Sequence, residues 1–442
     1  MKPRNLLVAA VVLAALSGGV WWAKKHPQSA SSSSTASASN AKLVEIPDAQ
    51  IQSIDLRKKD GTDVTLQRAN GKWTITSPSQ LNADQDAANS LASSLSPVTA
   101  DNVVEDKPTD LSKYGLKTPS LTVTVDEKNG KSQKLVFGDD VPAGSLVYAT
   151  ANNDGKVYAV ASSVKSSFDK SANDLRDKRL LTFDSNHLTR IDVDSAKEDL
   201  EFGKNNANEW QILKPQPYRA DNFQVEELLR KLTDAKMDLS SSADDAKKAA
   251  VAFASGQKVA TAKVTDNSGT ETLEVHKNKD DYYAKSSVVP GVFKVSSDLG
   301  KELEKNTDDF RNKKLFDFGF SDPSKLQLQT GSSDKSYVRA GTDWKLNGKT
   351  MDPGSIQSFV DKLRDLSATK FATSGFTTPA TSVTVTSNDG KRVEKVEFAK
   401  DKDGYLARRD NDPTLYQLDG KAVDDMLSAG NAIKPVASGG KK

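Results

Sequence analysis

Apolar residues alternate with polar ones over three stretches of the chain, and each stretch ends close to a tryptophan. The stretches are Ile54–Ile75, Ile191–Ile212 and Leu326–Leu346, and the tryptophans are Trp73, Trp210 and Trp344. In the first stretch, Asp60-Gly61 and Asn70-Gly71 interrupt the alternation with dipeptides that favour hairpin turns. A period of two places alternate side chains on one face of a strand. Each stretch therefore predicts an antiparallel meander of three strands, with the tryptophan on its last strand.

After each tryptophan the apolar period lengthens to that of a helix, and an aspartate precedes the change. The aspartates are Asp84, Asp221 and Asp352, and the apolar stripes begin at Ala88, Val225 and Ile356. Further apolar residues follow at i+3, i+4 and i+7, which form one face of an amphipathic helix. An aspartate at that place can accept from free N–H groups of the first turn, so we expect three N-caps. Each tryptophan ring then faces a helix, and this burial is favoured over an exposed platform for sugars or peptides.

Two further segments recur. Gly115–Pro119 matches Gly375–Pro379, each before alternating valine and threonine, which indicates a fixed turn leading into a further β-hairpin. Leu175–Phe183 matches Phe310–Phe318, and each contains a basic cluster between apolar residues. One interpretation is a junction between units, whose arginines bond backbone carbonyls or a neighbouring aspartate. The other is a docking surface for an acidic partner, with Arg176 and Arg311 as bidentate anchors.

These recurrences predict an α+β fold of three tandem repeats after an N-terminal transmembrane helix. Each repeat is an antiparallel β-meander with a packed amphipathic helix and a further β-hairpin, and its length is that of a whole domain. The predicted segments are a membrane anchor or signal peptide at 1–25, a flexible linker at 26–44, repeats at 45–186, 187–320 and 321–430, and a disordered tail at 431–442.

The N-terminus has the pattern of a membrane segment. Lys2 and Arg4 precede an apolar stretch from Leu6 to Ala23, which as a helix would cover roughly 27 Å, close to the hydrocarbon thickness of a bilayer. Both an uncleaved anchor and a cleaved signal peptide fit this pattern. Either one predicts export. We expect a single-pass protein of the bacterial inner membrane whose body lies in the periplasm, held by a tether rich in serine and alanine.

Composition and charge exclude several classes of function. The chain has no cysteine, so disulfides, thiol chemistry and cysteine metal sites are excluded. Its 62 basic and 60 acidic residues are interspersed, which leaves no basic stripe for nucleic acid. His26, His187 and His276 lack metal-ligand spacing, and no phosphate loop, nucleophile elbow or dinucleotide motif occurs. We therefore predict no catalytic residues, no cofactor and no metal, although carboxylates from distant segments could form a hydrolase site.

A set of residues in the first predicted repeat resembles a known family. The residues are Trp73, Ala83-Asp84, Tyr114-Gly115-Leu116 with Pro119, Phe137-Gly138 and Tyr148. In this order they are similar to the bacterial family called domain of unknown function 4340, over most of residues 45–430. The chain departs from the family pattern where Met351 precedes Asp352 and where the middle repeat loses its Gly-Pro turn.

The resemblance implies an exported, membrane-anchored protein, often encoded beside ABC-transporter components and related to auxiliary proteins of the gliding-motility type. The family has no established catalytic residues to carry over. The favoured function is thus a non-enzymatic, membrane-tethered accessory or scaffold protein of an ABC-type transport system. Its expected partners are the membrane and ABC-transporter subunits, with no nucleic acid and no identified small-molecule ligand. A glycan- or peptide-binding module of the cell envelope is the main alternative, and an envelope hydrolase is the third.

Overall fold

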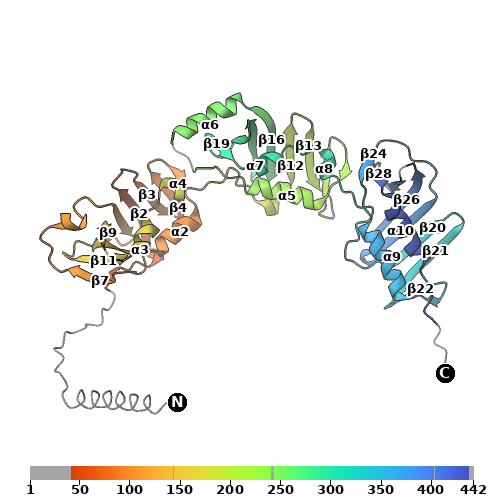
Figure 1. Ribbon diagram of the computed structural model, residues 1–442, viewed down its shortest axis with the longest axis horizontal. Coiled ribbons are helices and arrows are strands. Elements are labelled where there is room, and N and C mark those ends of the chain that lie inside the picture. Colours follow the sequence, from red (N-terminus) through yellow and green to blue (C-terminus); the bar gives the residue numbers. More distant parts are fainter. Residues whose placement is uncertain (1–40, 143, 240–242, 403, 438–442) are drawn as a thin grey trace, which may run out of the picture. The chain divides into compact units, whose positions relative to one another are not determined.

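The computed structural model describes residues 41–142, 144–239, 243–402 and 404–437 (Figure 1). They belong to two compact units, one ending at Asp177 and one beginning at Lys178. Large antiparallel sheets with helices confirm the predicted α+β class. The predicted anchor at 1–25 and most of the predicted linker lie outside the described residues. In the described part of the chain, the helices are all too short or too polar to span a bilayer.

The N-terminal unit is built on one antiparallel sheet in which the predicted meander is confirmed. Its strands are, in spatial order, β5 (Leu81–Asn82), β4 (Lys72–Ser77), β3 (Val64–Ala69), β2 (Ile51–Lys58), β8 (Leu121–Glu127), β9 (Ser132–Asp140), β10 (Leu146–Ala151), β11 (Val157–Ala161) and β7 (Asn102–Glu105). Ile54 of the meander pairs with Leu66 on one side and with Val125 on the other. The predicted further hairpin therefore continues the meander's own sheet.

The unit that begins at Lys178 contains two more sheets with the same strand order. The middle sheet consists of β15 (Tyr218–Arg219), β14 (Trp210–Lys214), β13 (Asp199–Lys204), β12 (Arg190–Ser195), β16 (Gln257–Asp266), β17 (Gly269–Asn278), β18 (Asp281–Ser286) and β19 (Val292–Val295). The third consists of β23 (Lys349–Thr350), β22 (Asp343–Leu346), β21 (Ser333–Ala340), β20 (Lys325–Thr330), β25 (Thr381–Ser387), β26 (Arg392–Asp401), β27 (Gly404–Arg409), β28 (Leu415–Leu418) and β24 (Lys370–Ala372). Each sheet has its own hydrophobic core.

A helix follows each tryptophan, and its predicted cap is confirmed in all three places. The helices are α2 (Gln85–Ser93), α5 (Asn222–Thr233) and α9 (Pro353–Asp365). The carboxylates of Asp84, Asp221 and Asp352 accept hydrogen bonds from N–H groups of the first turn. The apolar stripe of each helix is buried. Trp73, Trp210 and Trp344 are 2%, 2% and 8% exposed, so the rings belong to the cores and do not form a binding platform.

The other helical elements were not predicted. They are α3 (Ser162–Phe168), α4 (Ala172–Leu175), α6 (Ala243–Ser255), α7 (Ser297–Glu302), α8 (Thr307–Phe310) and α10 (Gly420–Asn431), with the 3-10 turns η1 (Asp48–Gln50), η2 (Leu111–Tyr114), η3 (Ser185–His187) and η4 (Asn388–Gly390). Helix α6 stands where the other two sheets have the edge strand β7 or β24, and it packs on β17, β18 and β19 (Figure 1).

Each core begins with a short apolar segment that pairs with the chain after the main helix, through strand β1 (Lys42–Val44) in the N-terminal unit and through isolated β-bridges at Arg179 and Lys314 in the other two cores. Strand β1 pairs with β6 (Val98–Thr99) and lies inside the range predicted as linker. Leu43 and Val44 are buried in the core, which explains why the chain is ordered there. The equivalent residues Leu180 and Leu181 pack into the core of the middle sheet, although they fall within the predicted first repeat.

The C-terminal segment 431–442 was predicted to be disordered, and this is wrong for residues 431–437. Ile433 is 8% exposed and belongs to the third core. Pro435 forms a β-bridge with Met351, and the N–H of Asp352 donates to the carbonyl of Lys434 at 2.8 Å. The side chain of Ile433 buries apolar surface that holds this segment against the third core. Residues 438–442 lie outside the described part of the chain.

Candidate functional site

Arg311, one of the two predicted docking residues, is enclosed by residues of its own chain. Its guanidinium lies over the rings of Tyr218 and Phe371, at 4.0 Å and 3.6 Å from their centroids. It also donates to Asp308 at 3.0 Å and to Thr414 at 3.1 Å, and its side chain is 10% exposed. The guanidinium therefore joins the middle sheet to the third, as the junction interpretation expects.

Arg176, the other predicted docking residue, belongs to the N-terminal unit and is not brought together with Arg311. It follows α4, forms a β-bridge with Ala83, and donates its backbone N–H to the carbonyl of Ala172 at 2.9 Å. Its side chain is partly buried, and this burial lowers the pKa of the guanidinium. Each of the two arginines thus begins the short connection that leads out of one core toward the next.

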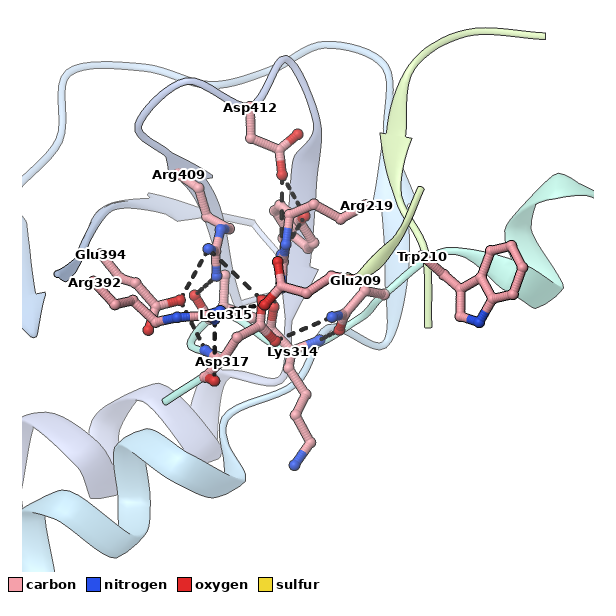
Figure 2. A network of polar contacts seen from close by, with 12 residues as sticks. Glu209, Trp210, Arg219, Lys314, Leu315, Asp317, Arg392, Glu394, Arg409 and Asp412 are labelled. Atoms are coloured by element: carbon pink, nitrogen blue, oxygen red, sulfur yellow. Dashed lines mark hydrogen bonds and ion pairs between the residues drawn. The ribbon is translucent and has the colours of Figure 1, made fainter. Parts of the chain in front are cut away.

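A cluster of charged residues that the sequence analysis missed lies close to Arg311, between the middle and third sheets. Arg219, at the end of β15, forms an ion pair with Asp317 (Figure 2). It also donates to the hydroxyl of Tyr416 at 2.9 Å and to the carbonyl of Lys314 at 3.0 Å. The Tyr416 hydroxyl in turn donates to Asp412 at 2.7 Å. We call Arg219, Asp317, Arg392, Glu394, Arg409 and Glu209 the charged cluster.

Two more arginines complete the charged cluster from strands of the third sheet. Arg392, at the start of β26, pairs with Glu209 and donates to the carbonyl of Asp317 at 3.2 Å. Arg409, at the end of β27, donates to Glu394 at 3.0 Å and lies 3.9 Å from Asp317. The backbone N–H of Asp317 donates to Glu394 at 2.8 Å. Figure 2 shows the three guanidiniums around Asp317, and the ring of Trp210 pointing away from them.

The electrostatics of the charged cluster hold Asp317 and Arg219 in their charged forms. Burial acts to raise the pKa of Asp317, but the charges of Arg219 and Arg409 outweigh it and the pKa lies below its usual range. Burial likewise opposes the charged form of Arg219, yet Asp317 keeps the pKa of this guanidinium above its ordinary value. Burial raises the pKa of Tyr416 to about 12, despite the opposing charge of Arg219. Asp317 therefore stays ionised at neutral pH, which suits a structural ion pair and not a general acid.

The charged cluster forms part of the wall of a cleft of ≈ 660 Å³. Outside the charged cluster its lining includes amide and basic side chains, among them those of Asn205, Gln211, Asn222, Asn388 and Lys391. Among the described residues, no group of three or more histidines and carboxylates has a geometry that could hold a metal ion. His187 hydrogen-bonds to Asp184, and His276 hydrogen-bonds to Glu274 and to the carbonyl of Phe253, so neither faces this cleft. The cleft can offer hydrogen bonds to a polar ligand.

A difference between equivalent positions could have revealed the cluster in the sequence. The carbonyls of Arg219 and Asn82 accept equivalent hydrogen bonds, from Asn312 and Asp177. The backbone N–H groups of Asp317 and Thr182 likewise each donate to a glutamate on the second strand of the following hairpin. Arg219 thus stands where the first copy has Asn82, which adds a positive charge. Asp317 stands where the preceding copy has Thr182, which adds a negative charge at the same junction. Complementary charge changes at two positions indicate that these positions are in contact. The features that the copies share do not include such changes.

The comparison with known protein families gives one match. The model of the family described as "Domain of unknown function (DUF4340)" matches residues 73–209 and again residues 210–382. Each matched range begins at a core tryptophan, Trp73 or Trp210. No curated protein and no solved structure matches the chain. Because the matched ranges cover most of the sequence, the chain belongs to the family of domain of unknown function DUF4340.

Proposed function

We propose that the protein is a non-enzymatic accessory or scaffold protein that works outside the cytoplasm, held at the bacterial inner membrane by residues 1–25. In this proposal the body consists of three tandem repeats of one α+β unit, associated with an ABC-type transport system. The observation that carries it is the burial of the recurring residues. The tryptophans and the stripes build cores and the aspartates cap helices, so what recurs is structure and not a chemical site.

The charged cluster supports the same role. Asp317 is held ionised by two guanidiniums, and Arg311 is enclosed by two rings and two hydrogen-bonding groups. Such contacts fix one core against the next and leave these side chains without a free catalytic function. The linker predicted from residue 26 onward would raise the concentration of the body near a membrane partner by keeping it within reach.

Photo-crosslinking of the full chain in native membranes tests this role. A photoreactive phenylalanine analogue replaces Phe223 on α5 or Phe320 before β20, since both side chains are exposed. The same analogue at Phe202, which is buried in the middle core, is the matched control. We expect an ABC-transporter subunit in the products from the exposed positions and not from the control. Its absence from every exposed position, with the N-terminal segment intact, would refute the association.

The cleft beside the charged cluster favours a second candidate, a binding module for polar peptides of the cell envelope. Its amide side chains offer both donors and acceptors, and the three tryptophans of the described residues are buried and leave a glycan no indole ring there to stack on. Titration calorimetry with short peptides of cell-wall composition, on the wild type and on Asn388→Ala with Lys391→Ala, separates the two. Heat of binding that the double substitution abolishes would favour the module over the scaffold.

A further inference from the structure

The outer edge of the N-terminal sheet is a short strand that carries two exposed valines. Strand β7 is the last strand of this sheet, and its neighbour is β11. Val103 and Val104 are 43% and 41% exposed, although they are adjacent and so lie on opposite faces of the strand. Leu111, on the same loop, is also exposed. An edge strand of this kind presents unpaired backbone groups together with apolar side chains, which favours the addition of another strand.

The other two sheets cover the equivalent edge. In the middle sheet, α6 packs on β17, β18 and β19, and the N–H of Asp238 donates to the carbonyl of Lys294 on the edge strand at 2.9 Å. In the third sheet, Arg311 lies over Phe371 of the edge strand β24, and Lys370 places a charge beside it. Helix, arginine and lysine are the devices that natural sheets use to block edge pairing. Strand β7 contains neither lysine nor proline.

The charges at this edge indicate what could pair with it. Asp101 and Glu105 flank the two valines, and Asp106 follows, paired with Lys156 at 2.9 Å. A second copy of the strand, antiparallel to the first with the valines paired, would place Asp101 opposite Glu105 or Asp106 of that copy. Like charges directly opposite each other destabilise a strand pair. Asp101 and Glu105 attract a strand with basic residues at its ends, whereas the charge of Asp106 is already paired with Lys156.

From this edge we infer that β7 is a strand-addition site for an extended segment of a partner protein. This segment has β-branched residues in its middle and basic residues at its ends. Backbone hydrogen bonds to β7 would supply much of the affinity, while Val103, Val104 and the flanking acids select the sequence. This inference deepens the proposed scaffold role, because it specifies one segment that the scaffold would hold.

A synthetic peptide with the sequence Lys-Val-Thr-Val-Thr-Val-Lys, labelled with fluorescein, tests the inference against the full chain in lipid nanodiscs. We expect anisotropy to report saturable binding, and the affinity to fall about tenfold or more when Val103→Lys and Val104→Lys are combined. A peptide with glutamates in place of the terminal lysines should bind more weakly than the original. The matched control is Val338→Lys, because Val338 is 47% exposed but lies on the interior strand β21.

Three outcomes would overturn the inference. One is equal binding by the wild type and the double variant, with circular dichroism spectra and unfolding temperatures that show both to be folded. Another is equal affinity for the lysine and glutamate peptides. The third is a dimer in sedimentation that the double variant abolishes, since a second copy would then be the occupant. None of these outcomes depends on the transporter. The peptide-binding result can therefore be interpreted even if the crosslinking at Phe223 and Phe320 fails.

Discussion

Asp317 carries the charge on which the contact between the middle and third cores depends most. Its carboxylate pairs with Arg219, accepts from Asn312 at 3.0 Å and lies near Arg409. Because the folded protein lowers the pKa of Asp317 below that of the unfolded chain, ionisation of this group stabilises the fold. That stabilisation is fully present above the unfolded value of about 3.9, and it is lost as the pH falls through the folded value.

We therefore expect Asp317→Asn to lower the free energy of unfolding by about 3 kcal/mol at pH 7, since it removes the close ion-pair partner of the buried Arg219 guanidinium, whereas Arg409 keeps its bond to Glu394. The difference from the wild type should shrink when both are measured near pH 3. Urea unfolding of the unit that begins at Lys178, followed by circular dichroism, gives both values. Asp365→Asn is the control, because this exposed aspartate should show neither the loss nor the pH dependence. A loss that stays constant between pH 7 and pH 3 would contradict the ionic explanation.

Residues that recur were predictable from the sequence, and residues that differ between copies were not. Trp73 and Asp84 reappear in each copy, so their roles in core and cap followed from helix and strand periodicity. Arg219 and Asp317 occur at one junction, far apart in the sequence, and no periodicity relates them. Their pairing depends on how two cores meet, which composition and spacing do not encode.

At the scale of elements, the segment after α10 closes the third core. Ile433→Asp should lower the free energy of unfolding of the unit that begins at Lys178 by about 3 kcal/mol, because it buries an unpaired carboxylate in place of an aliphatic side chain. A chain that ends after Asn431 should lose a similar amount, since it also lacks the bridge between Met351 and Pro435. Urea unfolding measures both.

The matched control for this element is Val436→Asp, because Val436 lies in the same segment but its side chain is half exposed. It should change stability by less than about 0.5 kcal/mol. If Ile433→Asp and Val436→Asp behaved alike, the segment would be bound loosely, and the original expectation of disorder would apply again.

The length of an element explains part of what the sequence could predict, although α6 and α10 were missed despite their 13 and 12 residues. The meanders and the helices α5 and α9 each repeat their period several times, so the pattern identified them. Helices α4 and α8 span four residues each, which is too short to show a helical period. Strand β1 was missed because its two apolar residues follow a long polar stretch, although Lys42-Leu43 repeats the basic-leucine pair of Arg179-Leu180 and Lys314-Leu315.

At the scale of the whole molecule, the two compact units have separate cores and should unfold as separate cooperative transitions. Trp73→Ala removes a large side chain from the N-terminal core, and it should cost that unit about 3–5 kcal/mol, or about 10 °C in its transition temperature. The transition of the other unit should keep its temperature. Differential scanning calorimetry of the full chain measures both.

The reciprocal variant Trp210→Ala provides the control, since it should move the transition of the second unit and spare the first. Circular dichroism at low temperature would show that each variant still folds. A single transition that both substitutions shift together would mean that the units unfold cooperatively, against this expectation.

The short connection between the middle and third cores bears on how this gene could be rearranged. Phe310 still belongs to one core and Leu315 already belongs to the next, so four residues separate them. At about 3.5 Å for each residue, that linker has little slack. To graft, shuffle or excise a unit, one would need to cut inside this tetrapeptide. A boundary placed after it would leave Leu315, the first apolar residue of the third core, attached to the preceding unit.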